Sequence, residues 1–353
     1  MALLRRLLLK FPSEVRCGPC LKYSTAAGEY GASLESIQEA ATRIRPYANR
    51  TPVMTSDYLN DLSSRNLFFK CEIFQKGGAF KFRGGCNAVF SLSEETAAKG
   101  VVTHSSGNHA GALALAANMR KIPAFIVIPE GAPQCKLDAV TENGGKITQC
   151  FPSVPEREKT AAIIQEKTGA TMIPPYNYGP VISGQGTMAL EFLEQVAELD
   201  AIVVPVSGGG MLSGIAIAAK ALKPAIKVIA AEPSGKNEAP DVALSKARGE
   251  LVDLPVPDTI ADGLRAKLGS LTWPIIRDHV DDVVIVKEEE IIVAMKLIFE
   301  RMKVVVEPSG AVGLAAVLSN QFQVCEDLKA CKNVGIILCG GNLDLEPLFQ
   351  TYK

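Results

Sequence analysis

Short apolar runs alternate with amphipathic segments along most of the chain. Runs such as 101–104 (VVTH), 124–128 (AFIVI) and 201–206 (AIVVPV) are rich in β-branched residues and end at glycine, proline or polar residues, which is typical of buried strands. Between such runs, segments such as 156–167 and 211–222 have the apolar spacing of helices. Apolar strands that alternate with helices indicate an α/β fold with parallel sheets.

The same pattern predicts the other elements. Further strands are expected at 67–70, 146–148, 172–173, 227–232 and 335–338. Ser33 can cap a helix that begins at Leu34, and other helices are expected at 86–92, 110–118, 136–142, 188–196, 289–302 and 309–319. Three glycine-containing turns follow predicted strands, and these turns carry the candidate chemistry.

Composition narrows the class of protein. The 353 residues are 47% hydrophobic and 21% charged, with a formal net charge of -1, so we expect neither nucleic acid nor membrane as a partner. No apolar run approaches the ~20 residues that a membrane span needs. The nine cysteines are an odd number spread over a long chain, which favours a reducing compartment over a disulfide framework. Cys17 and Cys20 have metal-site spacing but lack a second pair, so we interpret the spacing as chance.

Residues 1–32 differ from the rest of the chain. Met1 to Lys10 carries Arg5 and Arg6 among leucines, and the first acidic residue is Glu14. This pattern resembles an organelle transit peptide, and a disordered extension is the alternative. We therefore expect the protein in the cytoplasm, or in a mitochondrion or plastid if the leader is a transit peptide.

The segment 76–85 (KGGAFKFRGG) places Lys81 between two phenylalanines and glycine pairs. Apolar rings and the nearby Arg83 should disfavour the ammonium form, so Lys81 can act as an amine nucleophile of the Schiff-base kind. The alternative is a loop-to-helix junction whose lysine extends along apolar surface to reach water.

The segment 207–211 (SGGGM) lies between a buried strand and a helix. Glycines there expose backbone N–H groups at a helix N-terminus, which suits a phosphate group. The segment fits neither the dinucleotide fingerprint nor the P-loop. A glycine turn that serves only close packing is the alternative.

Two more turns follow predicted strands: 105–109 (SSGNH) and 339–342 (CGGN). The first offers hydroxyls, an amide and helix N-terminal N–H groups, which suit a carboxylate and a ring hydroxyl; a capping cluster is the alternative. Ligands of open α/β sheets bind at the carboxyl ends of strands, where all three turns are expected. A lysine, a phosphate site and a carboxylate site together indicate a pyridoxal-phosphate site.

Eight motifs occur in order from about Ser33 to the C-terminus: KGGAFKFRGG, THSSGNHA, SGQGT, VSGGGMLSG, AAEPSG, TIADGL, VEPSGA and CGGNLDL. Together they resemble the serine/threonine dehydratase family of fold-type II pyridoxal-phosphate enzymes, and within it the eukaryotic enzymes that racemise serine. The resemblance implies an α/β architecture of two open parallel sheets with flanking helices. It also implies a large cofactor-binding domain (33–100 and 176–353), a small mobile domain (101–175) and a homodimer.

The resemblance implies a role for each matching residue. Lys81 is then the Schiff-base lysine and the base on one face of the substrate, and Ser106 is the acid–base group on the opposite face. Phe80 packs on the cofactor ring, Asn108 bonds the ring hydroxyl and Cys339 faces the pyridine nitrogen. The phosphate is held by Ser207, Gly208, Gly209, Gly210 and Met211. The substrate carboxylate is held by Ser105, Ser106, Gly107, Asn108 and His109, with Arg157 near the entrance.

The resemblance also implies a divalent-cation site. Glu232, Glu238 and the carbonyl of Lys236 match its ligands, and carboxylates with a carbonyl suit Mg²⁺, or Mn²⁺ or Ca²⁺. Lys236 and Asn237 depart from the residues usual there. Ser207 replaces the first glycine of the phosphate loop, and Cys339 replaces the commoner serine. Nucleotide activation, by ATP, stays open.

These expectations define an enzyme that acts on a small amino acid. The predicted reactions are racemisation of L-serine to D-serine and dehydration of serine to pyruvate and ammonia. The alternative on the same fold is a threonine or 3-hydroxyaspartate dehydratase. A non-catalytic vitamin-B6-binding protein and a nicotinamide dehydrogenase are further alternatives, disfavoured by the intact Lys81 and by the missing dinucleotide fingerprint.

Overall fold

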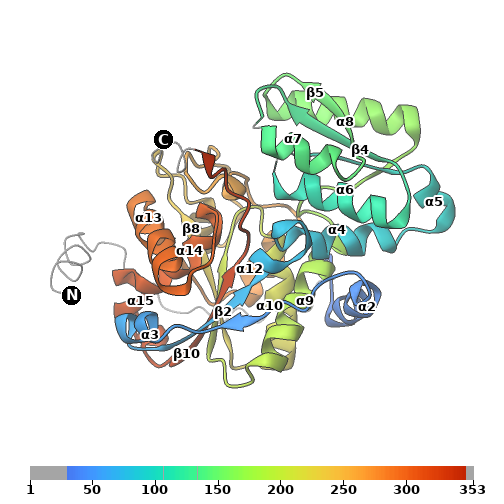
Figure 1. The fold of residues 1–353 in the computed structure, drawn as a ribbon. Coiled ribbons are helices and arrows are strands. Elements are labelled where there is room, and N and C mark those ends of the chain that lie inside the picture. The colour runs from blue at the N-terminus through green and yellow to red at the C-terminus, as the bar shows by residue number, and fades with distance from the viewer. Residues whose placement is uncertain (1–29, 106, 133, 347–353) are drawn as a thin grey trace.

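The computed structural model describes residues 30–105, 107–132 and 134–346. Its strands form a six-stranded and a four-stranded sheet, and Figure 1 shows them as two units side by side. The larger sheet has the order β1-β2-β10-β7-β8-β9, and all neighbouring pairs are parallel except β1 and β2. Its strands are β1 (Val53–Met54), β2 (Asn66–Cys71), β7 (Ala201–Pro205), β8 (Lys227–Pro233), β9 (Asp282–Val286) and β10 (Asn333–Leu338). The expected α/β fold is confirmed.

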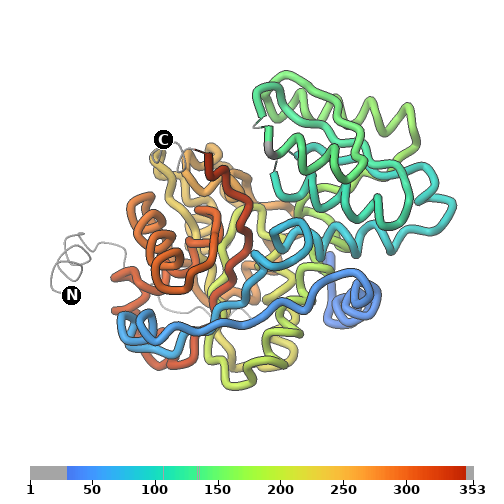
Figure 2. Tube along the Cα trace, in the orientation of Figure 1, coloured from blue at the N-terminus to red at the C-terminus, as the bar shows by residue number. Residues whose placement is uncertain are grey.

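The four-stranded sheet is parallel, in the order β5-β4-β3-β6. Its strands are β3 (Val101–His104), β4 (Ala124–Pro129), β5 (Lys146–Cys150) and β6 (Thr171–Met172). The helices α6 (Asn108–Arg120) and α7 (Gln134–Thr141) pack on one face, and α8 (Val154–Thr168) packs on the other. Figure 2 shows the teal and green chain of this unit apart from the rest of the molecule.

Alternating side chains of the larger sheet build two separate cores. On β7, Ala201 and Val203 face one core, whereas Ile202 and Val204 face the other, as the two-residue period of a strand requires. The first core is covered by α3 (Asp57–Ser63), α13 (Glu288–Leu297), α14 (Pro308–Leu318), α15 (Asn320–Val324) and α16 (Glu326–Lys329). The second is covered by α2 (Leu34–Ile44), α9 (Gly179–Gln195), α10 (Gly210–Leu222), α11 (Asp241–Arg248) and α12 (Trp273–His279).

Two helices begin earlier than the sequence predicts. Helix α4 (Lys81–Phe90) begins at Lys81 instead of residue 86, and α9 begins at Gly179 instead of residue 188. Their glycines are contact points: a Cβ on Gly184 would lie 2.7 Å from the Cα of Gly84. The glycines inside these two helices let them pack closely. The strands β1 and β9 were not predicted.

The remaining elements are short. They are α5 (Glu94–Ala98), the 3₁₀ turns η1 (Glu72–Phe74), η2 (Lys76–Gly78) and η3 (Asp262–Leu264), and the π-helical segment η4 (Ile298–Met302). Within the described ranges, no helix has the length and apolar character that a membrane crossing needs. Within these ranges, free and buried thiols belong to Cys71, Cys86, Cys150, Cys331 and Cys339, and Cys325 is buried as well.

Candidate active site

Lys81 is the first residue of α4, and the turn that Gly77 and Gly78 form with positive φ angles comes shortly before it. Its Nζ donates a hydrogen bond to the carbonyl of Pro175 at 2.9 Å and lies 5.0 Å from the ring centroid of Phe80. Burial lowers the pKa of Lys81 to about 8, although Cys339 and Glu307 act in the opposite direction. The amine is therefore partly unprotonated near neutral pH, as a nucleophile or base must be.

Arg83 does not act on Lys81 in the way that the sequence suggested. Its Nε lies 2.8 Å from Glu72, its Nη1 lies 2.8 Å from Glu191, and the Nζ of Lys70 lies 2.9 Å from Glu191. Lys70, Glu72, Arg83 and Glu191 thus form a buried charge network in which two cations meet two anions. The side chains of both cations are fully buried. Burial, rather than the charge of Arg83, is the main cause of the lowered pKa of Lys81.

The structure places Asn108 and Cys339 at the lysine segment. The backbone N–H of Phe80 donates to the carbonyl of Cys339 at 2.9 Å, which joins the lysine turn to the end of β10. The side chain of Asn342 donates to Asn108 Oδ1 at 2.9 Å. Burial raises the pKa of the Cys339 thiol well above its ordinary value, so the thiol is neutral.

Glu307 is a site residue that the sequence analysis did not assign. Asn108 Nδ2 donates to its two carboxyl oxygens at 2.9 and 3.1 Å, and the carboxyl group is buried. Burial raises the pKa of Glu307 to about 7. The motif VEPSGA could have indicated this residue, because it places Glu307 directly before Pro308 at the start of α14. Glu307 fixes the orientation of the amide that was predicted to bond the cofactor.

We expect Glu307 to make the stability of the cofactor-free protein depend on pH. Its pKa rises from an ordinary 4.5 to about 7 on folding, so the folded state binds the extra proton in this range. The stabilisation is present below pH 4.5 and is lost as the pH rises through about 7, on the order of 3 kcal/mol. Urea unfolding across this range measures the loss.

The variant Glu307→Gln should flatten this part of the stability profile. Glu326→Gln, which changes an exposed acid on α16, is the matched control and should leave the profile unchanged. An equally steep profile in Glu307→Gln would assign the pH dependence to another group.

The predicted phosphate loop joins β7 to α10. Gly209 has φ 90° and is the N-cap of α10, and no side chain caps the helix, so the first N–H groups are free for an anion. A Cβ on Gly208 would lie 2.4 Å from the ring of Tyr176, so the loop requires glycine there. Thr272 Oγ1 donates to the carbonyl of Gly208 at 2.7 Å and fixes the loop from behind.

The remaining loop residues have supporting contacts. Ser207 Oγ donates to the carbonyl of Ala266 at 3.0 Å and accepts from its N–H at 2.9 Å, and Met211 is buried in α10. Tyr176 follows Pro175, whose carbonyl accepts from Lys81. The segment Pro175–Tyr176, which the sequence analysis did not assign, therefore brings the loop next to the lysine. An uncapped helix N-terminus beside a half-buried lysine fits the phosphate and the aldehyde of pyridoxal phosphate.

The predicted carboxylate turn leads into α6. Gly107 is the N-cap, its N–H donates to Ser105 Oγ at 3.3 Å, and no side chain caps α6. His109 is buried with Nε2 3.0 Å from the carbonyl of Ile173, while its Nδ1 has no hydrogen-bond partner in the described chain. Burial lowers the pKa of His109 to about 3, so the ring is neutral. Ser106 lies outside the described residues.

Arg157 lies near the same turn. It is half-buried on α8, and its charge adds to burial in lowering the pKa of His104, the residue before Ser105. No hydrogen-bond partner for the buried Nε of Arg157 occurs among the described residues. Its predicted place near the substrate entrance and its role there stay predictions.

The predicted metal ligands lie at the end of β8. Glu232 is buried and accepts hydrogen bonds at 2.9 Å from the N–H groups of Val242 and Ala243 in the first turn of α11. Burial, together with the neighbouring Asp241, raises the pKa of Glu232 to about 8. Glu238 lies in the exposed loop with φ 49°. In the described part of the chain, no cluster of three or more His, Cys, Asp or Glu side chains forms a metal site.

With this geometry in place, comparison with known proteins is informative. Residues 44–340 match the family described as pyridoxal-phosphate dependent enzymes. The chain belongs to this family. Pyridoxal phosphate is therefore confirmed as the cofactor, and the lysine, the phosphate loop and the uncapped helices are the candidate site for it.

Relatives of this pyridoxal-phosphate enzyme are similar over most of their length. Serine racemase from Arabidopsis thaliana is 60% identical, covering 92% of this chain and 97% of the relative. A β-hydroxyaspartate dehydratase from Paracoccus denitrificans is 48% identical, covering 90% of this chain and 99% of the relative. The structure of maize serine racemase superimposes with a TM-score of 0.90 at 54% identity, covering 92% of this chain and 97% of the maize chain. This match confirms the predicted fold class.

Proposed function

We propose that this protein is a pyridoxal-phosphate-dependent serine racemase that also dehydrates serine. The observation that carries the proposal is the environment of Lys81: a half-buried lysine whose amine has a lowered pKa, near two helix N-termini that no side chain caps. One N-terminus suits the cofactor phosphate and the other the substrate carboxylate. The similarity to serine racemases supports serine as the substrate.

The chain's own residues position the reactants. The phosphate loop 207–211 and Lys81 hold pyridoxal phosphate, which when bound supplies an electron sink for the pair left by loss of the Cα proton. Asn108, oriented by Glu307, donates to or accepts from the cofactor hydroxyl. The neutral thiol of Cys339 leaves the ring nitrogen without a charged partner.

Two faces of the substrate carry two proton transfers. Neutral Lys81 takes the Cα proton of L-serine on one face. If Ser106 returns a proton on the opposite face, the product is D-serine. If the β-hydroxyl leaves instead, hydrolysis gives pyruvate and ammonia. Arg157 and the α6 N–H groups hold the carboxylate while either outcome proceeds.

Incubation with L-serine, L-threonine and 3-hydroxyaspartate tests the proposal. Chiral chromatography of serine and keto-acid detection should show D-serine and pyruvate from L-serine. Rapid elimination from 3-hydroxyaspartate without D-serine formation would favour the second candidate, a 3-hydroxyaspartate dehydratase, which the similarity to the Paracoccus enzyme supports. No turnover of any of the three would contradict both candidates.

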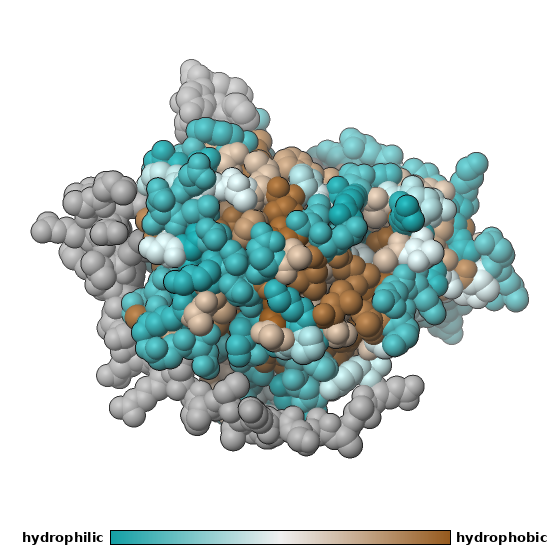
Figure 3. Space-filling view, turned by 90° about the horizontal axis from the view of Figure 1, so that it is seen from below, coloured by the Kyte–Doolittle hydropathy of each residue, from teal (hydrophilic) through white to brown (hydrophobic). Residues whose placement is uncertain are grey.

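We also propose the predicted assembly, a homodimer whose small domain (101–175) moves against the large domain (33–100 and 176–353). Figure 3 shows apolar residues gathered in the middle of the face seen from below, with hydrophilic residues around them. Apolar patches of this kind mark protein interfaces. Lys136 of α7 and Asp262 of η3 form an ion pair of 2.5 Å between the two units. This ion pair would stabilise the position in which the small domain is closed against the large one.

A divalent cation at Glu232 is part of the proposal. Glu232 and Asp241 are both buried, and burial raises the pKa of each, so a hard cation such as Mg²⁺ would compensate their charges. Adding Mg²⁺ to chelator-treated protein should therefore raise its melting temperature. At a Mg²⁺ concentration a hundredfold above Kd, the free energy of unfolding should increase by about 2.7 kcal/mol.

Variants assign that effect to the site. Glu232→Gln should remove the Mg²⁺-dependent rise, whereas Glu250→Gln, at an exposed position after α11, should retain it. A rise of the same size in Glu232→Gln would place the cation elsewhere. Activation by ATP, and a place in the cytoplasm or in an organelle, stay predictions that activity assays with the nucleotide and localisation of a tagged full chain can test.

A further inference from the structure

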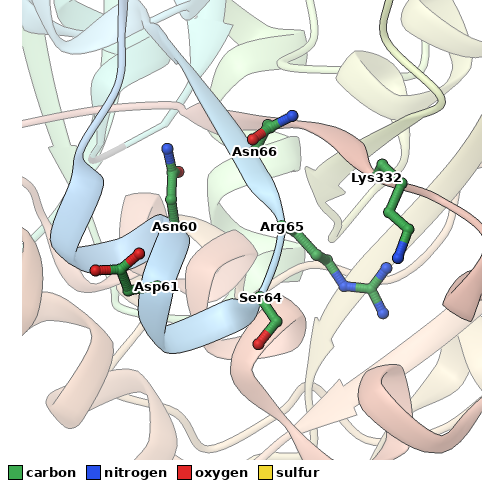
Figure 4. A pocket seen from close by; sticks show the side chains of 6 residues that line it. All are labelled: Asn60, Asp61, Ser64, Arg65, Asn66 and Lys332. Carbon is green, nitrogen blue, oxygen red and sulfur yellow. The ribbon is translucent and has the colours of Figure 1, made fainter.

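A second hollow lies at the opposite end of the large sheet from the active site. It has a volume of about 370 Å³ and is lined by Asn60, Asp61, Ser64, Arg65, Asn66 and Lys332 (Figure 4). Strands β2 and β10 begin here and run parallel from Asn66 and Asn333 to Cys71 and Leu338. Six residues of strand span about 20 Å, so this hollow, the basal pocket, is separate from the lysine and its loops.

Arg65 is the central cation of the basal pocket. Only 8% of it is exposed, and its Nη1 donates to the carbonyl of Leu328 in α16 and to that of Cys331 just after the helix. The guanidinium also lies 5.2 Å from the ring centroid of Phe322. No carboxylate of the described chain forms an ion pair with it, and its pKa is lowered by burial. Buried charges are normally paired, so this cation lacks an anion.

The unsatisfied part of Arg65 is one edge of the guanidinium. Its Nε is buried and has no hydrogen-bond partner, and Nη2 donates to no described residue. The edge formed by Nε and Nη2 can donate two parallel hydrogen bonds, the arrangement that recognises carboxylate and phosphate oxygens. The two carbonyls explain Nη1 alone, so helix capping does not account for the whole side chain.

Other donors line the same pocket. Lys332 is exposed and makes no ion pair with a described residue, and Figure 4 shows its ammonium and the Arg65 guanidinium pointing toward one another. Asn60 Oδ1 accepts from the N–H of Leu67 at 2.9 Å, which leaves its amide NH₂ as a donor. Asp61, the acid of the lining, extends away from both cations in Figure 4.

We propose that the basal pocket binds the phosphate group of a small phosphorylated molecule. Two cations and a free guanidinium edge match a group that carries about two negative charges and three acceptor oxygens. A carboxylate, with one charge, would leave one cation unmatched. The volume lies within the range of small-molecule sites, so it admits more than the phosphate alone.

Calorimetric titration of the holoenzyme with inorganic phosphate tests the proposal, because bound cofactor already fills the loop 207–211. We expect one saturable phosphate per chain, and weakening by about tenfold or more in Lys332→Gln. Lys329→Gln, which removes an ammonium paired with Glu326 on nearby α16, is the matched control and should bind as the parent does.

Further titrations decide the nature of the ligand. Glycerol 3-phosphate should bind at least as tightly as inorganic phosphate, and acetate should bind more weakly than either. Arg65→Lys keeps the positive charge but loses the guanidinium edge of Nε and Nη2, so this variant should bind phosphate more weakly. Because Arg65 also caps α16, circular dichroism checks that the variant is folded. Absence of saturable binding, unchanged binding in Lys332→Gln, or equal binding of acetate and phosphate would overturn the proposal.

Discussion

Lys81→Ala should lose both racemisation and elimination, with kcat at least about 10⁴-fold lower. The variant lacks the amine that binds the cofactor covalently and takes the Cα proton, yet the phosphate loop stays intact. Borohydride reduction of the parent followed by peptide mapping should place a pyridoxyl group on Lys81. The amine of this half-buried lysine has a pKa lowered to about 8, which is the chemical reason for this selectivity.

Lys76→Ala provides the control for this experiment. Lys76 lies in the same glycine-rich segment, in η2, and is half-buried. The variant should keep both activities and the label on Lys81. A pyridoxyl group on any other lysine of the parent, or an active Lys81→Ala protein, would show that the catalytic amine is elsewhere.

Ser106→Ala should separate the two reactions. Racemisation needs an acid–base group on each face of the substrate, one to take the Cα proton and one to return it, whereas elimination from L-serine needs only the Lys81 face and loss of hydroxide. We expect at least about 10²-fold less D-serine from L-serine, with pyruvate formation retained. Elimination from D-serine, whose Cα proton points at the missing hydroxyl, should fail as well.

Ser105→Ala distinguishes this role from simple damage to the turn. The hydroxyl of Ser105 accepts the N–H of Gly107, so its loss should weaken carboxylate binding and lower both reactions in parallel. Cofactor absorbance of both variants reports whether pyridoxal phosphate is retained. If Ser106→Ala racemises serine as well as the parent does, or loses both reactions with its cofactor bound, Ser106 has a different role.

The sequence predicted the strands better than the helix boundaries. An apolar run such as 201–206 is bounded by turn residues, and β7 indeed ends at Pro205 before the phosphate loop. Gly84 and Gly184 were left out of the predicted helices, because glycine has a low intrinsic preference for helix. Only the folded chain shows that the two meet where α4 and α9 cross. The strand β9 pairs with β8 at the edge of the sheet, and was missed.

The sequence predicted those parts of the candidate site whose residues are adjacent along the chain. Lys81 and the loop 207–211 are recognisable from their own segments. Glu307 and Tyr176 are not, since Glu307 acts through Asn108, 199 positions away, and Tyr176 acts by packing against Gly208. The influence of Arg83 was misjudged for the same reason. Its partners Glu72 and Glu191 are brought to it by η1 and α9.

The buried charge network limits which amino-acid substitutions this chain can accept during evolution. Lys70, Glu72, Arg83 and Glu191 balance one another, so replacing any single member by a neutral residue leaves a buried charge without its partner. Such a loss typically costs about 3–5 kcal/mol, a large fraction of the stability of a domain. Substitutions at these four positions are therefore tolerated only when a cation and an anion of the network change together. Among homologues, we expect them to vary together or to stay fixed, including Arg83, which lies two positions from the catalytic lysine.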